Sequence, residues 1–346
     1  MITQDNHDLA VIKDVRDSHF KKKDPMLVEK ILKALSLLEL ISVEGLEFVF
    51  KGGTCLLILL EEPKRFSIDL DMIVDDTKAI IPVLNKICGP DKLFKSFVED
   101  KRKESKIPKS HYKVFYNSVI DNKEAYILID LIEGKSTYPR EIQSEIKPYY
   151  FKTVNPFIKI KTPSINAILG DKLTAFAPHT TGIKIDSKRD MEIAKQLFDV
   201  ATLFDHADDI NEVHQSFIKT ANLEIKYRGL EINVNDVLAD NFEAAYVIAM
   251  QNQYKPEIYS ILNSGTSKLK GYVFESFGQV EVHICAAKSA YLSQLLKQQV
   301  FTVEKFTNQD MKNIVIQNSS YTRLNIIKRI SPEAFYYWMK AVNLIE

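Results

Sequence analysis

Three polar residues at alternate positions, Ser67, Asp69 and Asp71, are the first candidates for chemistry in this sequence. They lie in segment 65–74, where polar and apolar residues alternate as in a strand with one wet face and one core face. Residues i, i+2 and i+4 of a strand project from the same face. Two carboxylates so placed can hold Mg²⁺, which prefers hard oxygen ligands and can clamp a triphosphate. The alternative is a half-buried strand whose exposed face is acidic.

An adjacent pair of glycines, Gly52 and Gly53, precedes these acids between a short β-rich run and an apolar helical segment. Backbone N–H groups at such a turn can bind phosphate oxygens, and glycine permits their close approach. The chain has only 11 glycines, about half the usual frequency, so an adjacent pair is less expected by chance. Thr54 either contacts phosphate or, as our first choice, caps the helix.

The elements that must position these residues are predicted from the periodicity of apolar side chains. An amphipathic helix is expected over 26–44, a strand over 46–50, a helix over 55–60 and the acidic strand over 65–74. A helix over 77–88 and strands over 112–118 and 125–132 follow. Together they predict an α+β fold in which helices flank a mixed sheet.

From about residue 164 onward the pattern becomes mostly helical. Helices are expected near residues 164–177, 187–206, 208–221, 235–252, 254–263, 271–297, 303–317 and 332–344. We therefore expect two domains. The first, over 1–205, holds the sheet and the first of these helices, and the second, over 206–346, is a helical bundle. The boundary stays open, because the turn-rich segment 178–187 is either a loop within the first domain or a linker.

Composition excludes some classes of protein. Lysine plus arginine (46) equals aspartate plus glutamate (46), so any attraction to nucleic acid or membrane must be local. The cysteines, Cys55, Cys88 and Cys285, lack metal-ligand spacing, which favours a reducing cytoplasm. The start of the chain lacks a signal-peptide pattern, and the apolar run 55–60 is far below the roughly 18–20 residues that span a bilayer. We expect a cytoplasmic protein with no membrane partner.

The motif Lys51-Gly52-Gly53-Thr54, followed by Arg65-Phe66-Ser67-Ile68-Asp69-Leu70-Asp71, resembles the abortive-infection toxin family AbiEii of the polymerase-β-like nucleotidyltransferase superfamily. A looser match extends to about residue 205. The resemblance implies a catalytic sheet domain joined to a helical domain, and Mg²⁺-dependent transfer of a nucleotide from an NTP. It also implies the toxin of a toxin–antitoxin or phage-defence pair, with a cognate antitoxin. The implied NTP-binding residues are Lys51, Gly52, Gly53, Thr54 and Ser67, and the implied catalytic metal ligands are Asp69 and Asp71.

The superfamily often has a third catalytic carboxylate on a later strand, and Asp130 in the apolar segment 126–132 is the matching metal-ligand candidate. An acid flanked by apolar residues is costly unless it is paired or binds a metal. The alternative is an acid at a strand end that faces solvent. Glu133 and Asp121 are weaker candidates.

Two further catalytic candidates come from the resemblance. Lys172 fits the lysine of the family's E-K-L-x-A pattern, although Asp171 replaces the usual glutamate. Its charge would suit a triphosphate, and the alternative is an ordinary solvated lysine. Asp199 fits the second aspartate of an R-D-x-x-D-L pattern whose first aspartate is replaced by Gln196. The role of Gln196 stays open.

A basic stretch over residues 92–113 contains eight lysines and arginines against three acids, with aromatic residues at its end. It is either an RNA-backbone surface with aromatic stacking positions or a solvated loop.

Among the seven histidines, none pairs with an acid at a recognisable catalytic spacing, and only His179, beside the proposed lysine helix, is singled out.

The leading hypothesis is therefore an NTP-using transferase that modifies RNA, with a tRNA end as the expected acceptor, held in check by an antitoxin. One alternative moves the nucleotide to a protein side chain or a small molecule, which the balanced net charge keeps open. Another is a catalytically silent member that binds nucleotide or a partner protein through the same sheet. The presence of the glycine pair together with Ser67, Asp69 and Asp71 argues against the silent alternative.

Overall fold

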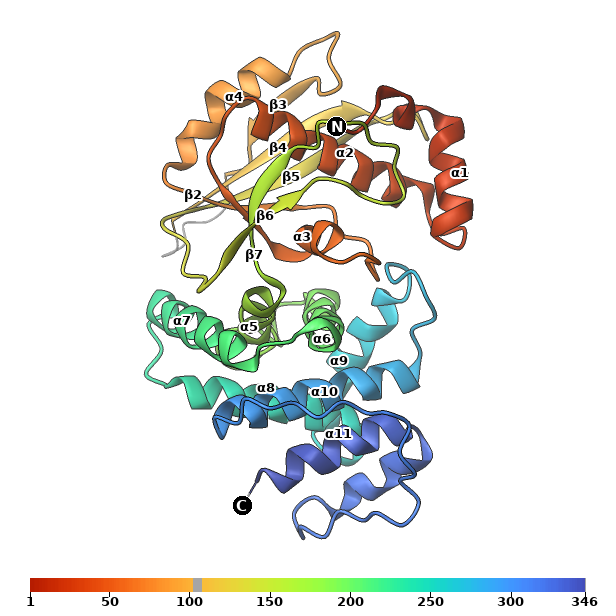
Figure 1. Cartoon of the computed structure of the whole chain (residues 1–346), viewed down its shortest axis with the longest axis vertical. Coiled ribbons are helices and arrows are strands. Elements are labelled where there is room, and N and C mark those ends of the chain that lie inside the picture. Colours follow the sequence, from red (N-terminus) through yellow and green to blue (C-terminus); the bar gives the residue numbers. More distant parts are fainter. Residues whose placement is uncertain (102–107, 346) are drawn as a thin grey trace. The chain divides into compact units, whose positions relative to one another are not determined.

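The computed structural model describes residues 1–101 and 108–345, which form two compact units (Figure 1). The first unit takes in residues 1–136 and 140–164 with the short segment 272–275. The second takes in residues 137–139 and 165–271 and the chain from 276 onward. Within the described residues, no helix is long and apolar enough to cross a membrane.

The first unit is built on a seven-stranded sheet with the order β3-β4-β5-β2-β1-β7-β6. Its strands are β1 (Val49–Lys51), β2 (Leu70–Val74), β3 (Ser96–Glu99), β4 (Lys109–Asn117), β5 (Glu124–Glu133), β6 (Glu141–Glu145) and β7 (Lys159–Pro163). The pairs β2–β5 and β1–β7 are parallel, and the other neighbours are antiparallel. The predicted mixed sheet of an α+β fold is confirmed.

Helices flank this sheet. They are η1 (Gln4–His7), α1 (Leu9–His19), α2 (Pro25–Val43), α3 (Gly52–Leu59), η2 (Thr77–Ala79) and α4 (Ile80–Ile87). Helix α2 begins where Asp24 accepts a hydrogen bond from the backbone N–H of Met26 at 2.9 Å, with Pro25 in the first turn. It packs against β5 and α4, so one face of the sheet is covered while the other carries the polar side chains.

The acidic strand is shorter than its alternation predicts. Ladder pairing in β2 begins only at Leu70, and Arg65 instead forms an isolated bridge with Val273. The ring of Phe66 packs on that of Phe274 with centroids 4.7 Å apart. Extended backbone therefore continues upstream of β2, but its partner is a segment some two hundred residues later in the chain. The alternation of polar and apolar residues indicates which face of a sheet each residue occupies, but it does not indicate which strand pairs with the segment.

The second unit is helical, as expected. Its elements are α5 (Ile165–Ala175), α6 (Asp190–His206), α7 (Ile210–Arg228), α8 (Val234–Met250), η3 (Gln251–Gln253), α9 (Pro256–Leu269), α10 (Gln279–Lys297), η4 (Thr322–Arg329) and α11 (Pro332–Asn343). A Cβ atom on Gly170 would lie 2.5 Å from the carbonyl oxygen of Val213, so glycine permits α5 and α7 to pack closely. Helices α5 and α6, which we expected in a domain over 1–205, pack within this unit.

The helix expected over 303–317 is wrong. This segment is irregular, although Met311 and Ile316 are buried. The side chain of Asn325 bonds both the N–H and the carbonyl of Ile316, at 2.9 and 3.0 Å. Apolar spacing alone does not make a helix here, and a side-chain amide supplies the backbone partners that a helix would provide.

Candidate active site

The glycine pair lies where β1 turns directly into α3, as the sequence predicted. Gly52 has φ +78°, a left-handed conformation that favours glycine. A Cβ atom on Gly52 would lie 1.9 Å from Oδ2 of Asp71, and one on Gly53 would lie 2.7 Å from Oγ of Ser67. Side chains larger than hydrogen would therefore collide with the acidic segment. The two motifs that the sequence separates meet at the N-terminal turn of α3.

Thr54 does not cap the helix, contrary to our first choice. The N-cap residue of α3 is Lys51, and it makes no side-chain capping bond. Thr54 is fully buried, and its hydroxyl donates to Oγ of Ser67 at 3.0 Å. Thr54 therefore holds Ser67 in place beneath the glycine turn.

Four polar residues form a row across four adjacent strands. Lys51 on β1 is the register partner of Asp71 on β2, which is the partner of Asp130 on β5, which in turn is opposite His111 on β4. Register partners in a sheet point to the same face, on strands about 4.8 Å apart. Asp69 precedes β2 and is exposed. The tertiary structure thus brings Asp130 beside Asp71, as the resemblance implied.

His111 is a member of this row that the sequence reasoning missed. Its Nδ1 atom lies 2.6 Å from Oδ1 of Asp130, with both side chains partly buried. Strands β4 and β5 form a hairpin in which Asn117 is opposite Glu124. Counting outward from that turn places His111 opposite Asp130, so a hairpin register assigned from the sequence would have found the pair.

The carboxylates fit a divalent cation through their chemistry. Within residues 1–101 and 108–345, no group of three or more His, Cys, Asp or Glu is gathered closely enough to hold a metal unaided. Mg²⁺ is commonly held by one or two carboxylates while substrate phosphates and water complete its oxygen shell. Asp71 supplies a hard oxygen donor of this kind beside the glycine turn, Asp69 stands two residues before it, and Asp130 is the neighbour of Asp71.

Two further candidates, Lys172 on α5 and Asp199 on α6, meet within the second unit. The Nζ atom of Lys172 lies 2.9 Å from Oδ2 of Asp199, and both side chains are buried. Lys172 also donates to Oε1 of Gln196 at 3.2 Å. The alternative of a solvated helix lysine is therefore wrong. Gln196, which stands where the family usually has an acid, is a second acceptor for the ammonium group.

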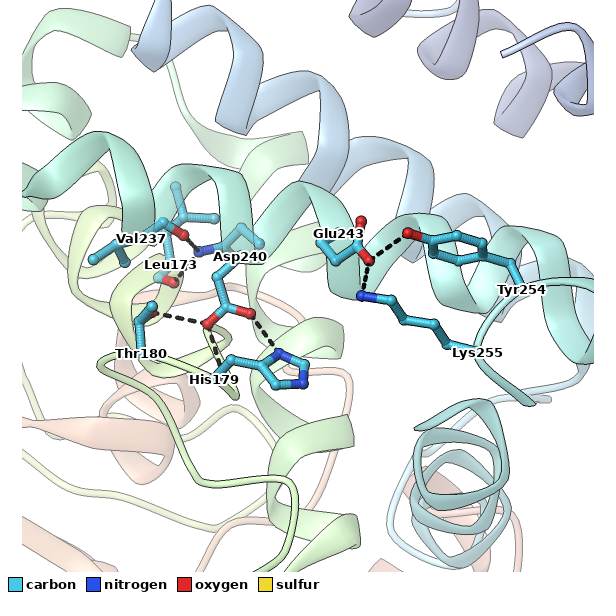
Figure 2. Close-up of polar contacts among 9 residues, drawn as sticks. Leu173, His179, Thr180, Val237, Asp240, Glu243, Tyr254 and Lys255 are labelled. Carbon is cyan, nitrogen blue, oxygen red and sulfur yellow. Dashed lines mark hydrogen bonds and ion pairs between the residues drawn. The ribbon is translucent and has the colours of Figure 1, made fainter. Parts of the chain in front are cut away.

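His179 is paired with an acid that the sequence did not suggest. Figure 2 shows Asp240 of α8 accepting from the N–H and Nδ1 of His179 and from Oγ1 of Thr180, each at 2.8 Å. The hydrogen bond to Asp240 raises the pKa of His179 above its usual value, against an opposing effect of burial. One turn along α8, Glu243 accepts from the hydroxyl of Tyr254 at 2.8 Å (Figure 2). The Asp240 contacts hold the segment after α5 against α8, and the Glu243 contact joins α8 to the residue that follows η3.

The basic stretch is only partly described. Arg102, Lys103 and Lys106 lie outside the described residues. In β4, Tyr112 and Tyr116 point into the core, so they are not stacking positions. Strand alternation explains this, because the two residues share the core face.

Comparisons with known proteins concern the family and the fold. The family model described as "Nucleotidyl transferase AbiEii toxin, Type IV TA system" matches residues 36–263. The fold resembles MenT4, a nucleotidyltransferase toxin from Mycobacterium tuberculosis H37Rv, with TM-score 0.55 and 14% identity over 94% of this chain and 98% of that chain. JHP933 from Helicobacter pylori matches 78% of this chain and 93% of its own, with TM-score 0.44 and 14% identity. No curated protein matches the sequence.

Proposed function

This chain belongs to the AbiEii family of nucleotidyltransferase toxins of type IV toxin–antitoxin systems, and from that membership we propose that it transfers a nucleotide from an NTP to RNA. The acceptor that we propose is the end of a tRNA. Asp69, Asp71 and Asp130 are the proposed carboxylates, with Mg²⁺ as the cation. The observation that carries the proposal is the contact between the Asp71 carboxylate and the glycine turn, where a Cβ atom on Gly52 would lie 1.9 Å from Oδ2.

The glycine turn is the proposed triphosphate site. The first N–H groups of a helix lack intrahelical partners, and the helix dipole favours negative charge there. Gly52 and Gly53 form the first turn of α3, and their lack of side chains lets Asp71 and Ser67 lie directly against this turn. Ser67, held by Thr54, adds a hydroxyl beside Gly53.

The acids supply the complementary part of the site. Carboxylates beside bound phosphates repel them unless a cation lies between, and Mg²⁺ would neutralise the charge that develops during phosphoryl transfer. Asp69 is exposed and Asp71 is partly buried, so the pair extends from the sheet toward solvent, where an NTP can enter. Asp130 is the proposed third carboxylate through its register with Asp71.

Lys172 and Asp199 are proposed to act as a pair. Because the ammonium group is buried against Asp199, its charge is offset, and Asp199 and Gln196 together set where that charge lies. A contribution of Lys172 to triphosphate binding remains a proposal from the family pattern.

Cellular context follows from the same premise. An NTP-using RNA transferase acts where NTPs and tRNA are abundant, so we place the protein in the cytoplasm, restrained by a cognate antitoxin. The cysteines support a reducing compartment, since Cys55 and Cys285 are buried and the three cysteines lie far apart in the sequence.

The test is incubation of the purified protein with each α-labelled NTP, Mg²⁺ and total bacterial RNA, followed by a denaturing gel. Wild type is compared with Asp69→Ala and Asp71→Ala, and with Asp75→Ala as a matched control at an exposed position just after β2. The proposal is supported if label appears on tRNA-sized RNA with wild type and with Asp75→Ala but not with Asp69→Ala or Asp71→Ala. Label that persists in both Asp69→Ala and Asp71→Ala contradicts the metal-binding role.

Balanced charge favours one alternative acceptor class. With 46 basic and 46 acidic residues, no overall field attracts RNA. Label that appears on protein or on a small molecule, and never on RNA, would move the acceptor to that class while keeping the chemistry. Nucleotide binding without label on any acceptor would favour a catalytically silent module.

A further inference from the structure

The hydrogen bond between His111 and Asp130 has a role that the family motif does not assign. We propose that His111 is a positioning residue, which orients the Asp130 carboxylate for nucleotidyl transfer through an Nδ1–H hydrogen bond. The inference rests on the proposed catalytic role of Asp130. His111 acts through Asp130 and need not touch the nucleotide.

The geometry of the sheet supports this role. His111 and Asp130 are opposite one another on antiparallel strands, and the heavy atoms that share the hydrogen are 2.6 Å apart. A hydrogen bond to an ionised carboxylate is charge-assisted, and such bonds are shorter and stronger than those between neutral groups. Since an ionised carboxylate only accepts, the Nδ1 atom must carry the proton.

The surroundings of Asp130 show why a partner is needed. Its neighbours along β5, Ile129 and Leu131, are fully buried on the opposite face of the sheet. Those contacts fix the backbone of β5, whereas the Asp130 carboxylate lies on the other face, where it is hydrogen-bonded to His111. A partly buried imidazole on the adjacent strand selects one carboxylate orientation, and such supporting partners are typically worth about 10- to 100-fold in activity.

The competing role for His111 is that of a base, in which Asp130 orients the imidazole and Nε2 takes a proton. Two substitutions separate these roles. Asparagine places an amide N–H near the Nδ1 position and cannot act as a base, whereas glutamine places its amide near Nε2. A positioning role requires His111→Asn to retain activity and His111→Gln to lose it.

The experiment measures kcat and the KM for NTP in the full-length protein. We expect His111→Ala and His111→Gln to lower kcat by about 10- to 100-fold with little change in KM, and His111→Asn to recover most of that loss. His111→Ala added to Asp130→Asn should cause no further loss, since residues that act through one contact are not additive. An inactive His111→Asn, or a further loss in the double variant, would overturn the proposal.

Folding and the proposed function are checked separately. His19→Ala is the matched control, because His19 is an exposed histidine of the same unit whose ring contacts Tyr149. Thermal unfolding of each variant identifies any global loss of structure. In protein with ¹⁵N-labelled histidine, an Nδ1–H resonance of His111 that shifts in Asp130→Asn reports the hydrogen bond without any turnover. If that resonance is present but wild type labels no acceptor, the proposed function fails while the contact stands, and absence of the resonance contradicts the inference itself.

Discussion

The Oδ2 atom of Asp71 lies so close to Gly52 that a Cβ atom there would be 1.9 Å away. No rotation of a small side chain on residue 52 relieves this overlap, because a Cβ atom is fixed by the backbone. The carboxylate must move, or the turn must open. Glycine at position 52 is therefore a condition for the acid strand and the helix turn to share one site.

The first prediction compares two glycines. Gly52 and Gly45 both have positive φ, +78° and +85°, but a Cβ atom on Gly45 would meet nothing within 4 Å. Alanine in the left-handed region costs roughly 1–2 kcal/mol, so both alanine variants should lose at least that much stability, and Gly52→Ala should lose more because of the collision with Asp71. Only Gly52→Ala should also lose activity, by about 100-fold, because it displaces Asp71, the proposed metal ligand. Equal transferase activity in Gly45→Ala and Gly52→Ala would show that the Asp71 contact has no catalytic importance.

The second prediction concerns the buried pair Lys172–Asp199, whose charged atoms are 2.9 Å apart. Removing one partner leaves the other charge buried, which costs about 3–5 kcal/mol. Asp199→Ala should lower the free energy of unfolding by that order, measured by urea denaturation. Lys172→Met with Asp199→Leu should be far less destabilising, because apolar replacement of a whole buried pair is often neutral. A stable double variant without transferase activity would support the proposed functional role of the pair, and full activity would reject it.

The third prediction is a pH dependence from His179. The hydrogen bond to Asp240 raises the pKa of His179 in the folded state. The folded protein therefore binds this proton more tightly than the unfolded chain does. The stabilisation is present below the unfolded pKa, about 6.5, and is lost as pH rises through the folded pKa. The difference in unfolding free energy between wild type and His179→Asn should therefore be larger at pH 6 than at pH 9. A difference that grows with pH would contradict the assigned contact.

The fourth prediction concerns His283 on α10, whose contribution to stability should change with pH in the opposite direction to that of His179. Burial lowers the pKa of His283 to about 4, and its Nε2 lies 3.2 Å from the amide nitrogen of Gln251. The unfolded chain then binds the proton first, so wild type should lose on the order of 3 kcal/mol of stability as pH falls from about 6.5 to 4. His283→Gln removes this titration, and its unfolding free energy should depend less steeply on pH over that range. An unchanged slope would show that His283 is accessible to protons in the folded protein.

Local chemistry explains what could be predicted for the site. The glycine turn and the placement of Asp71 on the face of β2 opposite the buried Leu70 and Met72 depend on residues close in sequence, where strand and helix periodicities apply. The same holds for helix α2, whose predicted span of 26–44 agrees closely with the observed Pro25–Val43. Steric limits and apolar spacing act over a few residues, so the sequence carries them directly.

Pairing over long separations could not be predicted in this way. His111 meets Asp130 only through the β4–β5 hairpin, and Arg65 reaches Val273 across most of the chain. Thr54 looked like a helix cap because capping is a local preference, yet its hydroxyl is bonded to Ser67. In each case the partner depends on which surfaces pack together.

The sequence by itself determined the chemical groups, the glycine turn, and the face of β2 on which Asp71 lies, because these follow from spacing along one strand or one helix. Tertiary structure alone decided that Asp71 lies against Gly52 and beside Asp130, and that Lys172 is buried against Asp199. Register and burial result from the folding of distant segments into one core. A pattern within a single segment does not contain them.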